Sequence, residues 1–189
     1  MKYPNGILKN NNNLITHSNR GMSLEEDLNQ TNDYYLQNDI AVIYKKPTAI
    51  TIKKVDYKNN DMITEAYFKT PSTTDYNGIY KGYYIDFEAK ETRSKTSFPL
   101  ANIHKHQIKH LINISEHGGI GFLIVKFSLL NKIYYLSIDA LTNYLNSSDK
   151  KSIPVAYFEK YGKEIKETYN PRINYLACVE VELNEKNNK

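Results

Sequence analysis

The segment Tyr83–Ala89 constrains the fold of this chain more than any other part of the sequence. Successive side chains of a β-strand point to opposite faces, so its apolar side chains share one face and its charged side chains share the other. These two sets are Ile85, Phe87 and Ala89, and Asp86, Glu88 and the following Lys90. The apolar face requires a core layer beneath it, so the segment belongs inside a sheet. Two carboxylates and an ammonium group in a row on the other face are uncommon for a core strand unless they are needed there.

The segments around this strand predict helices and further strands. Ser23–Glu26 is a capping box, and helical spacing of apolar residues continues to about Asn38. Further helices are expected over Leu100–His117 with Gly118 and Gly119 as the stop, from Asp139 as the N-cap through Leu145, and from Pro154 to near Gly162. Further strands are expected at Ile40–Tyr44, Ala49–Tyr57, Met62–Lys69, Ile120–Phe127, Ile133–Ile138 and Leu176–Glu182, with a turn at Lys58–Asp61. Helices that lie between strands predict an α/β fold with a central mixed sheet.

Length and composition limit the class of protein. The chain has 189 residues, a formal net charge of +4 and one cysteine, Cys178. This length suits one domain with its own core, and a single cysteine excludes an internal disulfide framework and a cysteine-based zinc site. No apolar run approaches the roughly 20 residues of a membrane span, and no signal peptide is evident. We therefore expect a cytoplasmic protein without a membrane partner, divided into a flexible arm at 1–22, a single domain at 23–183 and a flexible tail at 184–189.

The charged strand follows a further acidic residue in a turn-like segment. Asp75 lies in Thr73–Gly78, which ends close to the strand, so Asp75 and Glu88 can converge. Two carboxylates can hold Mg²⁺, which lowers the pKa of a bound water, and Lys90 can stabilise charge that builds on phosphorus. This set is typical of metal-assisted phosphodiester hydrolysis. The bare acidic–x–Lys pattern occurs four times in the chain, so an exposed strand face with ordinary salt bridges is the alternative.

The predicted helix that follows is rich in cationic and histidine side chains. Three of the five histidines and two lysines fall between positions 104 and 110. Such a surface suits a nucleic-acid backbone, with a solvated helix face as the alternative. His106 and His110 have a spacing that suits zinc, but no third ligand is evident. Gln107 lies on the same side as His110, and its carbonyl oxygen can complete a metal shell.

A series of strings resembles RecU-type Holliday-junction resolvases, in order from about residue 19 to 182. The strings are Asn19–Met22, Glu26–Leu28, Lys45–Thr48, Ile63–Phe68, Ser72–Gly78, Tyr84–Thr92, Ser97–Leu100, His106–Ile108, His117–Ile120 and Pro171–Ile173. The resemblance implies a restriction-endonuclease-like core, with a central mixed sheet flanked by helices, and a projecting stalk at roughly 46–72. It also implies a homodimer that resolves Holliday junctions by paired symmetric nicks in homologous recombination and DNA repair. The implied cofactor is Mg²⁺, for which Mn²⁺ can substitute.

The resemblance also assigns residues and partners. The metal-site residues would be Thr73, Asp75, Glu88 and Gln107, with Asp75, Glu88 and Lys90 as the catalytic set. Glu65 matches a further acidic position near the site, with an ordinary stalk or surface residue as the alternative. The DNA-binding candidates are Arg20, Lys53, Lys54, Tyr67, Phe68, Arg93, Lys95 and His106. Tyr67 and Phe68 can stack on bases at an open crossover, with interior packing as the alternative. The partners would be four-way junction DNA, a second copy of the chain, and recombinase and branch-migration proteins.

Two other functions remain open at this point. The first is a restriction-like or repair endonuclease that cuts duplex DNA with the same fold. The second is a non-catalytic junction-binding module, whose carboxylates form only salt bridges and whose binding falls steeply as salt rises.

Overall fold

A six-stranded mixed sheet forms the centre of the computed structural model, which describes residues 23–47, 50–57, 62–68 and 73–187. The strands lie in the order β1 (Val42–Lys45), β4 (Tyr76–Tyr80), β5 (Tyr83–Thr92), β7 (Ile120–Phe127), β8 (Lys132–Ser137) and β10 (Lys163–Ile165). β5 and β7 run parallel, whereas the other neighbours are antiparallel. A parallel pair requires a crossover connection, and the helix between β5 and β7 supplies it. The expected mixed sheet flanked by helices is confirmed.

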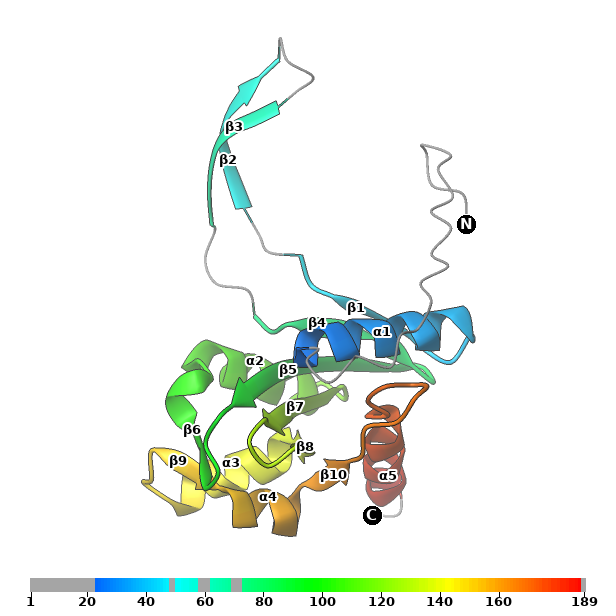
Figure 1. Ribbon diagram of the computed structural model, residues 1–189, viewed down its shortest axis with the longest axis vertical. Coiled ribbons are helices and arrows are strands. Elements are labelled where there is room, and N and C mark those ends of the chain that lie inside the picture. The colour runs from blue at the N-terminus through cyan, green and yellow to red at the C-terminus, as the bar shows by residue number, and fades with distance from the viewer. Residues whose placement is uncertain (1–22, 48–49, 58–61, 69–72, 188–189) are drawn as a thin grey trace.

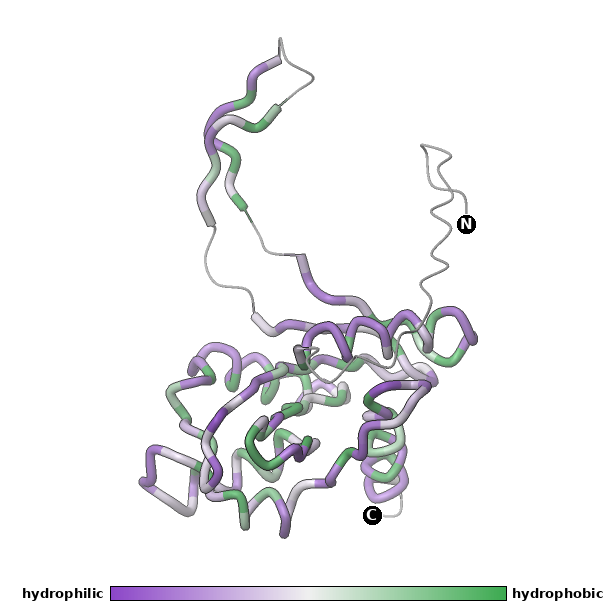
Figure 2. Tube along the Cα trace, viewed as in Figure 1, coloured by the Kyte–Doolittle hydropathy of each residue, from purple (hydrophilic) through white to green (hydrophobic). Residues whose placement is uncertain are grey.

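Helices cover both faces of this sheet (Figure 1). They are α1 (Leu24–Gln37), the 3₁₀ helix η1 (Leu100–Asn102), α2 (Lys105–Glu116), α3 (Ile138–Ser147), α4 (Val155–Tyr161) and α5 (Leu176–Asn187). On β7, Phe122 and Ile124 pack in a core with α1 and α5, while Leu123 and Val125 pack in a second core with α2, α3 and α4. Most of β7 is accordingly hydrophobic in Figure 2. None of the helices in the described ranges is long and apolar enough to cross a membrane.

The same alternation fixes the orientation of β5. Ile85 and Phe87 are fully buried in the core that α1 and α5 cover. The charged side chains of β5 therefore point to the opposite face, where α2 lies. The predicted separation of the two faces of this strand is confirmed.

α1 begins at the predicted capping box. Ser23 N donates to Glu26 Oε2 at 2.9 Å, and Glu26 N donates to Ser23 Oγ at 3.3 Å. The inner face of the helix carries a buried carboxylate, Asp27, whose Oδ1 accepts from Arg172 Nε at 2.9 Å and whose Oδ2 lies 3.7 Å from Lys126 Nζ. These contacts fasten α1 to the segment that precedes α5 and to β7, an interior strand of the sheet.

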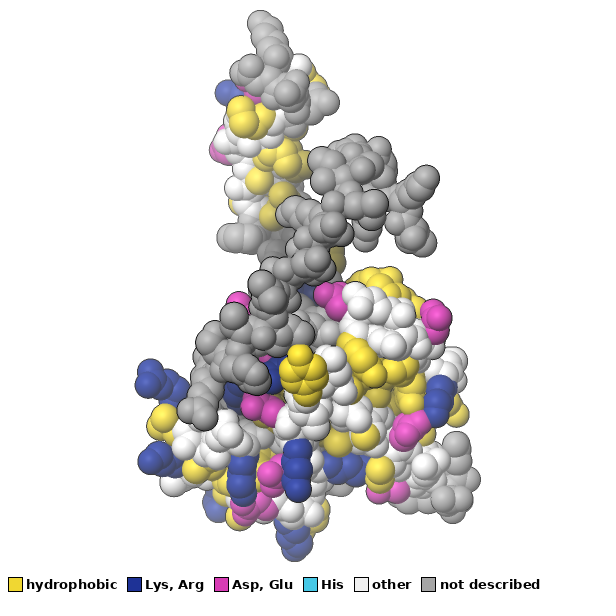
Figure 3. Space-filling view, turned by 45° about the vertical axis from the view of Figure 1, so that its right-hand side comes forward, with side chains coloured by type: hydrophobic (Ala, Val, Ile, Leu, Met, Phe, Trp, Pro, Cys, Tyr) yellow, Lys and Arg dark blue, Asp and Glu magenta, His cyan; other side chains and the backbone are white. Residues whose placement is uncertain are grey.

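The hairpin of β2 (Ile50–Asp56) and β3 (Met62–Phe68) projects from the body (Figure 1). The projecting stalk of the expected fold is confirmed. Apolar side chains lie exposed along it, among them Ile50, Ile52 and Tyr67, and Figure 3 shows this hydrophobic surface. The predicted turn at 58–61 and the predicted arm at 1–22 lie outside the described residues.

The predicted strand at Leu176–Glu182 is wrong, because these residues begin α5. Alternating valine and glutamate at 179–182 produced the strand pattern. The buried residues instead follow helical spacing: Leu176, Val179 and Leu183 lie in the core, while Val181 is 45% exposed. The core face thus extends over about two turns of helix to Leu183, one residue beyond the predicted strand. α5 continues to Asn187, so helix replaces the predicted tail as far as the structure describes the chain.

The predicted turn at Thr73–Gly78 is also largely wrong, since β4 begins at Tyr76. Tyr76 and Tyr80 are buried at the two ends of β4. The chain turns instead at Lys81 and Gly82, whose φ angles of 49° and 84° are left-handed. Such angles suit a two-residue hairpin loop, in which glycine carries no Cβ penalty.

Two predicted helix starts shift. α2 begins at Lys105 because η1 and two further residues occupy the start of the predicted helix. Ser137, not Asp139, caps α3, since Ser137 Oγ accepts from Ala140 N at 3.2 Å. A short two-stranded sheet of β6 (Ser97–Pro99) and β9 (Ser152–Pro154) was not predicted.

Candidate functional site

Two acidic side chains of β5 are buried on the sheet face that α2 covers. The side chains of Asp86 and Glu88 are both 0% exposed, and that of Lys90 is 26% exposed. A buried carboxylate is costly unless it is paired or coordinates a metal. The partners of each carboxylate therefore indicate its role.

Glu88 converges with Asp75, as the sequence predicts. Asp75 Oδ2 accepts a hydrogen bond from Ala89 N at 3.2 Å, which holds its carboxyl alongside β5. Glu88 Oε1 accepts from Gln107 Nε2 at 2.7 Å and forms an ion pair with Lys90 Nζ. Burial raises the pKa of Glu88 from 4.5 to about 7, and the adjacent Asp75 carboxylate also raises it, against the lowering effect of Lys90. The two acidic groups are thus close enough to oppose each other's ionisation.

The donor set of this pair fits a divalent cation. Glu88 Oε2 is buried and has no hydrogen-bond partner among the described residues. A cation between Asp75 and Glu88 would supply that partner and neutralise two like charges. The described parts of the chain hold no cluster of three or more His, Cys, Asp or Glu side chains suited to a metal. Further ligands would therefore be neutral oxygens, such as hydroxyl, amide, backbone carbonyl or water, which Mg²⁺ accepts.

Gln107 lies against Glu88 but presents its amide nitrogen to it. Its carbonyl oxygen, Oε1, accepts from His104 N at 2.9 Å in the capping box of α2. The predicted role of this oxygen as a metal ligand stays a prediction, and it requires the amide to rotate out of the capping box. Thr73 is exposed, and its Oγ1 accepts from Lys46 Nζ at 3.2 Å.

Asp86 anchors a second polar cluster, which sequence analysis did not find. Its Oδ2 lies 2.7 Å from Lys46 Nζ, 3.0 Å from the donating hydroxyl of Tyr84 and 3.0 Å from His110 Nε2. Its Oδ1 accepts from the hydroxyl of Thr74. Period-two alternation already placed Asp86 beside Glu88 on the charged face. No sequence signal pairs Asp86 with Lys46, which lies 40 positions away.

α2 reaches both carboxylates because a glycine lets it lie close to the sheet. Gly121 of β7 is the register partner of Asp86. A Cβ at this position would lie 2.8 Å from the backbone oxygen of Leu111 in α2. This close approach brings Gln107 to Glu88 and His110 to Asp86.

The structure places Glu65 in the stalk, where it forms an ion pair with Lys53 at 2.7 Å. It is not brought to the Asp75–Glu88 pair, contrary to the expectation of an acidic residue near the site. Lys54 and Tyr67 are exposed on the same hairpin, so interior packing of Tyr67 is excluded. The side chain of Phe68 lies outside the described part of the structure.

The remaining DNA-binding candidates lie on the body. Arg93 and Lys95 are exposed in the segment that follows β5, and His106 is exposed in the first turn of α2, where its ring stacks on that of His104. Arg20 lies outside the described residues. Cys178 is buried and free, and burial raises the pKa of its thiol to about 11, in agreement with the predicted core position.

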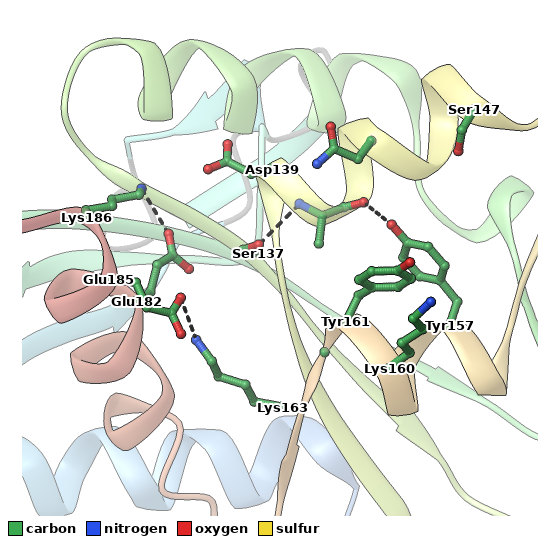
Figure 4. Close-up of a pocket in the computed structure, with 13 residues that line it drawn as sticks. Ser137, Asp139, Ser147, Tyr157, Lys160, Tyr161, Lys163, Glu182, Glu185 and Lys186 are labelled. Carbon is green, nitrogen blue, oxygen red and sulfur yellow. Dashed lines mark hydrogen bonds and ion pairs between the residues drawn. The ribbon is translucent and has the colours of Figure 1, made fainter. Parts of the chain in front are cut away.

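The described surface has a small hollow beside the site and a larger one away from it. A small one of about 210 Å³ opens beside Asp75 and is also lined by Ser23, Glu25 and Glu91. A larger one of about 940 Å³ lies between α3, α4, β10 and α5 (Figure 4). Its charged side chains largely neutralise each other, as in the pairs Lys163–Glu185 at 3.6 Å and Lys186–Glu182 at 2.9 Å. No residue predicted for the site lines this larger hollow.

Comparisons with known proteins identify a family. The family model described as "RecU: Recombination protein U" matches residues 19–181. A protein named Holliday junction resolvase RecU from Bacillus cytotoxicus is 51% identical over 171 residues, which cover 88% of this chain and 86% of that protein. The protein of the same name from Geobacillus thermodenitrificans is 49% identical over 193 residues, covering 95% and 96%. The solved structure of Hjc from Archaeoglobus fulgidus, described as a Holliday junction resolvase, matches with a TM-score of 0.45 and 11% identity, covering 74% of this chain and 92% of that one.

Proposed function

This chain belongs to the recombination protein U family, and we propose that it is a divalent-metal-dependent endonuclease that resolves four-way DNA junctions by paired nicks. The observation that carries the chemistry is the convergence of Asp75 with buried Glu88 beside Lys90. Glu88 Oε2 is buried without a hydrogen-bond partner among the described residues, and a cation bound there would supply one. The relatives named Holliday junction resolvase support the choice of substrate.

Asp75 and Glu88 would hold the cation, with Thr73 and a rotated Gln107 as further oxygen donors. When bound, Mg²⁺, or Mn²⁺ in its place, polarises a phosphate oxygen and lowers the pKa of a water molecule. Because the pKa of Glu88 is about 7, its carboxyl must lose a proton before it can serve as a ligand. Metal affinity should therefore rise as the pH passes through 7.

Lys90 supplies the positive charge that faces the substrate. Its ammonium group forms an ion pair with Glu88 Oε1, and its side chain is partly exposed. Once the charge of Glu88 is neutralised, Lys90 is free to face a phosphate at the mouth of the site. There it can orient the attacking water and stabilise the negative charge that develops on the phosphorus substituents.

The stalk is suited to the open centre of a four-way junction. It projects from the body, and Tyr67, Ile50 and Ile52 are exposed on it. Aromatic side chains stack on unpaired bases irrespective of sequence, and junction centres are where such bases are accessible. Lys53 and Lys54 on the same hairpin would contact phosphate, while Arg93, Lys95 and His106 would do so from the body.

Paired nicks require two active sites, and we propose that a homodimer supplies them. The described residues of one chain contain one Asp75–Glu88 pair. A two-fold dimer presents two identical sites to opposed strands. β1 is an edge strand of the sheet, and Val42, Tyr44 and the neighbouring Ile79 are exposed on it and on β4. This apolar strip is our candidate contact surface for the second copy. Because the proposed substrate is cellular DNA and the named relatives are bacterial, we expect the protein to act in the cytoplasm.

The decisive experiment compares a labelled mobile four-way junction with a linear duplex of the same sequence. Both are incubated with the protein and Mg²⁺, Mn²⁺ or EDTA, with Glu88→Gln as the inactive control. Symmetric nicks on the junction alone, which are lost in EDTA and in the variant, are expected. Cutting of the duplex at comparable rates would favour a restriction-like enzyme. Tight junction binding without cleavage under any condition would reduce the protein to a binding module.

A further inference from the structure

The two legs of the stalk meet at one side chain. Lys46 lies where the chain leaves the body for the stalk, and Thr73 and Thr74 lie where it returns. Lys46 Nζ donates to Thr73 Oγ1 at 3.2 Å and to Thr74 Oγ1 at 2.6 Å. Its backbone N donates to Asp75 O at 2.7 Å. One residue of the outgoing leg thus binds three consecutive residues of the returning leg, and the last of these is the metal-site residue Asp75.

Asp86 holds this junction of the two legs to the body. The ammonium group of Lys46 is anchored on Asp86 Oδ2 at 2.7 Å, and the hydroxyl of Thr74 donates to Asp86 Oδ1. His110 of α2 lies 3.0 Å from the same Oδ2. Asp86 therefore connects the stalk base, the segment that carries Asp75, and the helix that carries Gln107.

The partners of Asp86 separate its role from that of Glu88, although both carboxylates point to the same face of β5. Both oxygens of Asp86 are engaged, one with Thr74 and the other with Lys46, Tyr84 and His110. Glu88 instead leaves one oxygen without a partner among the described residues. A carboxylate saturated by protein donors, one of them an ammonium group, has little capacity left for a metal ion. Asp86 is therefore placed to position other groups.

We propose that Lys46 and Asp86 form a brace that couples the seating of the stalk in a DNA junction to the position of Asp75. Both are then positioning residues for strand cleavage, and neither is a catalytic residue. The inference rests on the proposed function, because it assigns the brace to the same cleavage site. Because the brace ties the base of both legs to Asp86 and to Thr73–Asp75, a movement of the stalk base reaches the metal site through it. Misplacement of a reacting group by about 1 Å can cost roughly 100-fold in rate.

The test uses the full chain with Lys46→Met, Asp86→Asn and the double variant, beside Lys132→Met as a matched control. Lys132 carries the same charge but pairs with Glu159, outside the proposed brace. Each protein is assayed for the single-turnover cleavage rate at saturating junction, for junction Kd and for the salt dependence of Kd. We expect each brace variant to lose about 10- to 100-fold in rate, with Kd and its salt slope unchanged. The double variant should be no slower than the slower single variant, and the control should match the wild type.

Three results would overturn the brace. A weaker Kd with a salt slope reduced by about one for Lys46→Met would make Lys46 a phosphate contact. Multiplicative losses in the double variant would show that the two residues act independently. A raised Mg²⁺ requirement in Asp86→Asn that is absent from Lys46→Met would make Asp86 a metal ligand. If Asp86→Asn fails to fold because Lys46 loses its counter-charge, the double variant, which removes both charges, still decides the question.

A second measurement does not depend on cleavage. The Ala89 amide is protected by its bond to Asp75 Oδ2, so its hydrogen exchange reports the position of Asp75. Exchange at Ala89 should accelerate in Lys46→Met and Asp86→Asn but not in Lys132→Met. Unchanged exchange in the brace variants would refute the coupling. A wild-type protein that cuts no junction would refute the proposed function instead, while this exchange measurement would still judge the brace.

Discussion

Replacing Glu88 by glutamine should stabilise the metal-free protein at alkaline pH while it abolishes cleavage. The carboxyl of Glu88 is buried beside Asp75, and its pKa is raised from 4.5 to about 7. A shift of about 2.5 units corresponds to roughly 3 kcal/mol of unfavourable free energy for holding the ionised group in the fold. Glutamine has nearly the same shape and can still accept a hydrogen bond from Gln107, but it carries no charge. The variant avoids this cost.

The sign of the effect follows from proton binding. Between pH 4.5 and 7 the folded protein keeps the Glu88 proton that the unfolded chain has already lost. The wild type therefore loses stability relative to the variant as the pH rises through this window. The two proteins should be equally stable near pH 4, and their difference should reach its plateau of about 3 kcal/mol above pH 7. For a chain of this size, that corresponds to roughly 6–12 °C in Tm.

The assay is urea unfolding in EDTA at pH 4.5, 6 and 8.5, followed by circular dichroism, with Glu65→Gln as the matched control. Glu65 is an exposed carboxylate in the stalk, so its loss should leave the pH profile of the wild type intact. Addition of Mg²⁺ at pH 8.5 should raise the stability of the wild type more than that of Glu88→Gln. A variant that is less stable than the wild type at pH 8.5, or a difference independent of pH, would refute the like-charge explanation of the site.

Three further outcomes are expected. Gly121→Ala places a Cβ 2.8 Å from the Leu111 backbone oxygen. The variant should lose about 1–3 kcal/mol of unfolding free energy in thermal or urea unfolding, and cleavage should slow because α2 is displaced. Wild-type activity would show that this close approach is not needed. Tyr67→Ala should leave the free energy of unfolding unchanged but weaken junction binding by about 1–3 kcal/mol. Tyr169 is a similarly exposed residue on the body, and Tyr169→Ala should not weaken binding. Equal effects of the two variants in a binding titration would count against stacking by the stalk. Cys178, whose pKa is raised by burial to about 11, should resist iodoacetamide at pH 8 until the chain is unfolded, and rapid labelling of the native protein would contradict its core position.

The parts of this structure that the sequence predicts well are those whose signal is local. The alternation in Tyr83–Ala89 predicts both faces of β5, because each side chain follows directly from strand geometry. The Ser23–Glu26 capping box predicts the start of α1 for the same reason, since its bonds span three residues. The convergence of Asp75 with Glu88 is also local, because the two residues lie on adjacent parts of one hairpin.

The failed strand prediction at Leu176–Glu182 depends on partners far along the chain. The valine–glutamate alternation in α5 satisfies a strand pattern, and helix wins because Leu176, Val179 and Leu183 face the aromatic core of the sheet. Glu182 fits that buried helix face because the hydroxyl of Tyr135, 47 positions away, donates to it at 2.5 Å. The contact of Glu182 with Tyr135 has no signature within the segment itself.

Contacts between distant parts of the chain also decide the roles of the two buried carboxylates of β5. Strand alternation alone does not distinguish Asp86 from Glu88, two residues apart on one face. Their difference comes from Lys46 and His110, which are brought to Asp86 by the pairing of β1 with β4 and by the close approach of α2 at Gly121. Both oxygens of Asp86 thus bind protein donors, whereas Glu88 keeps one oxygen that lacks a partner among the described residues. A site arranged in this way holds one acidic group rigid and keeps the other available for a cation.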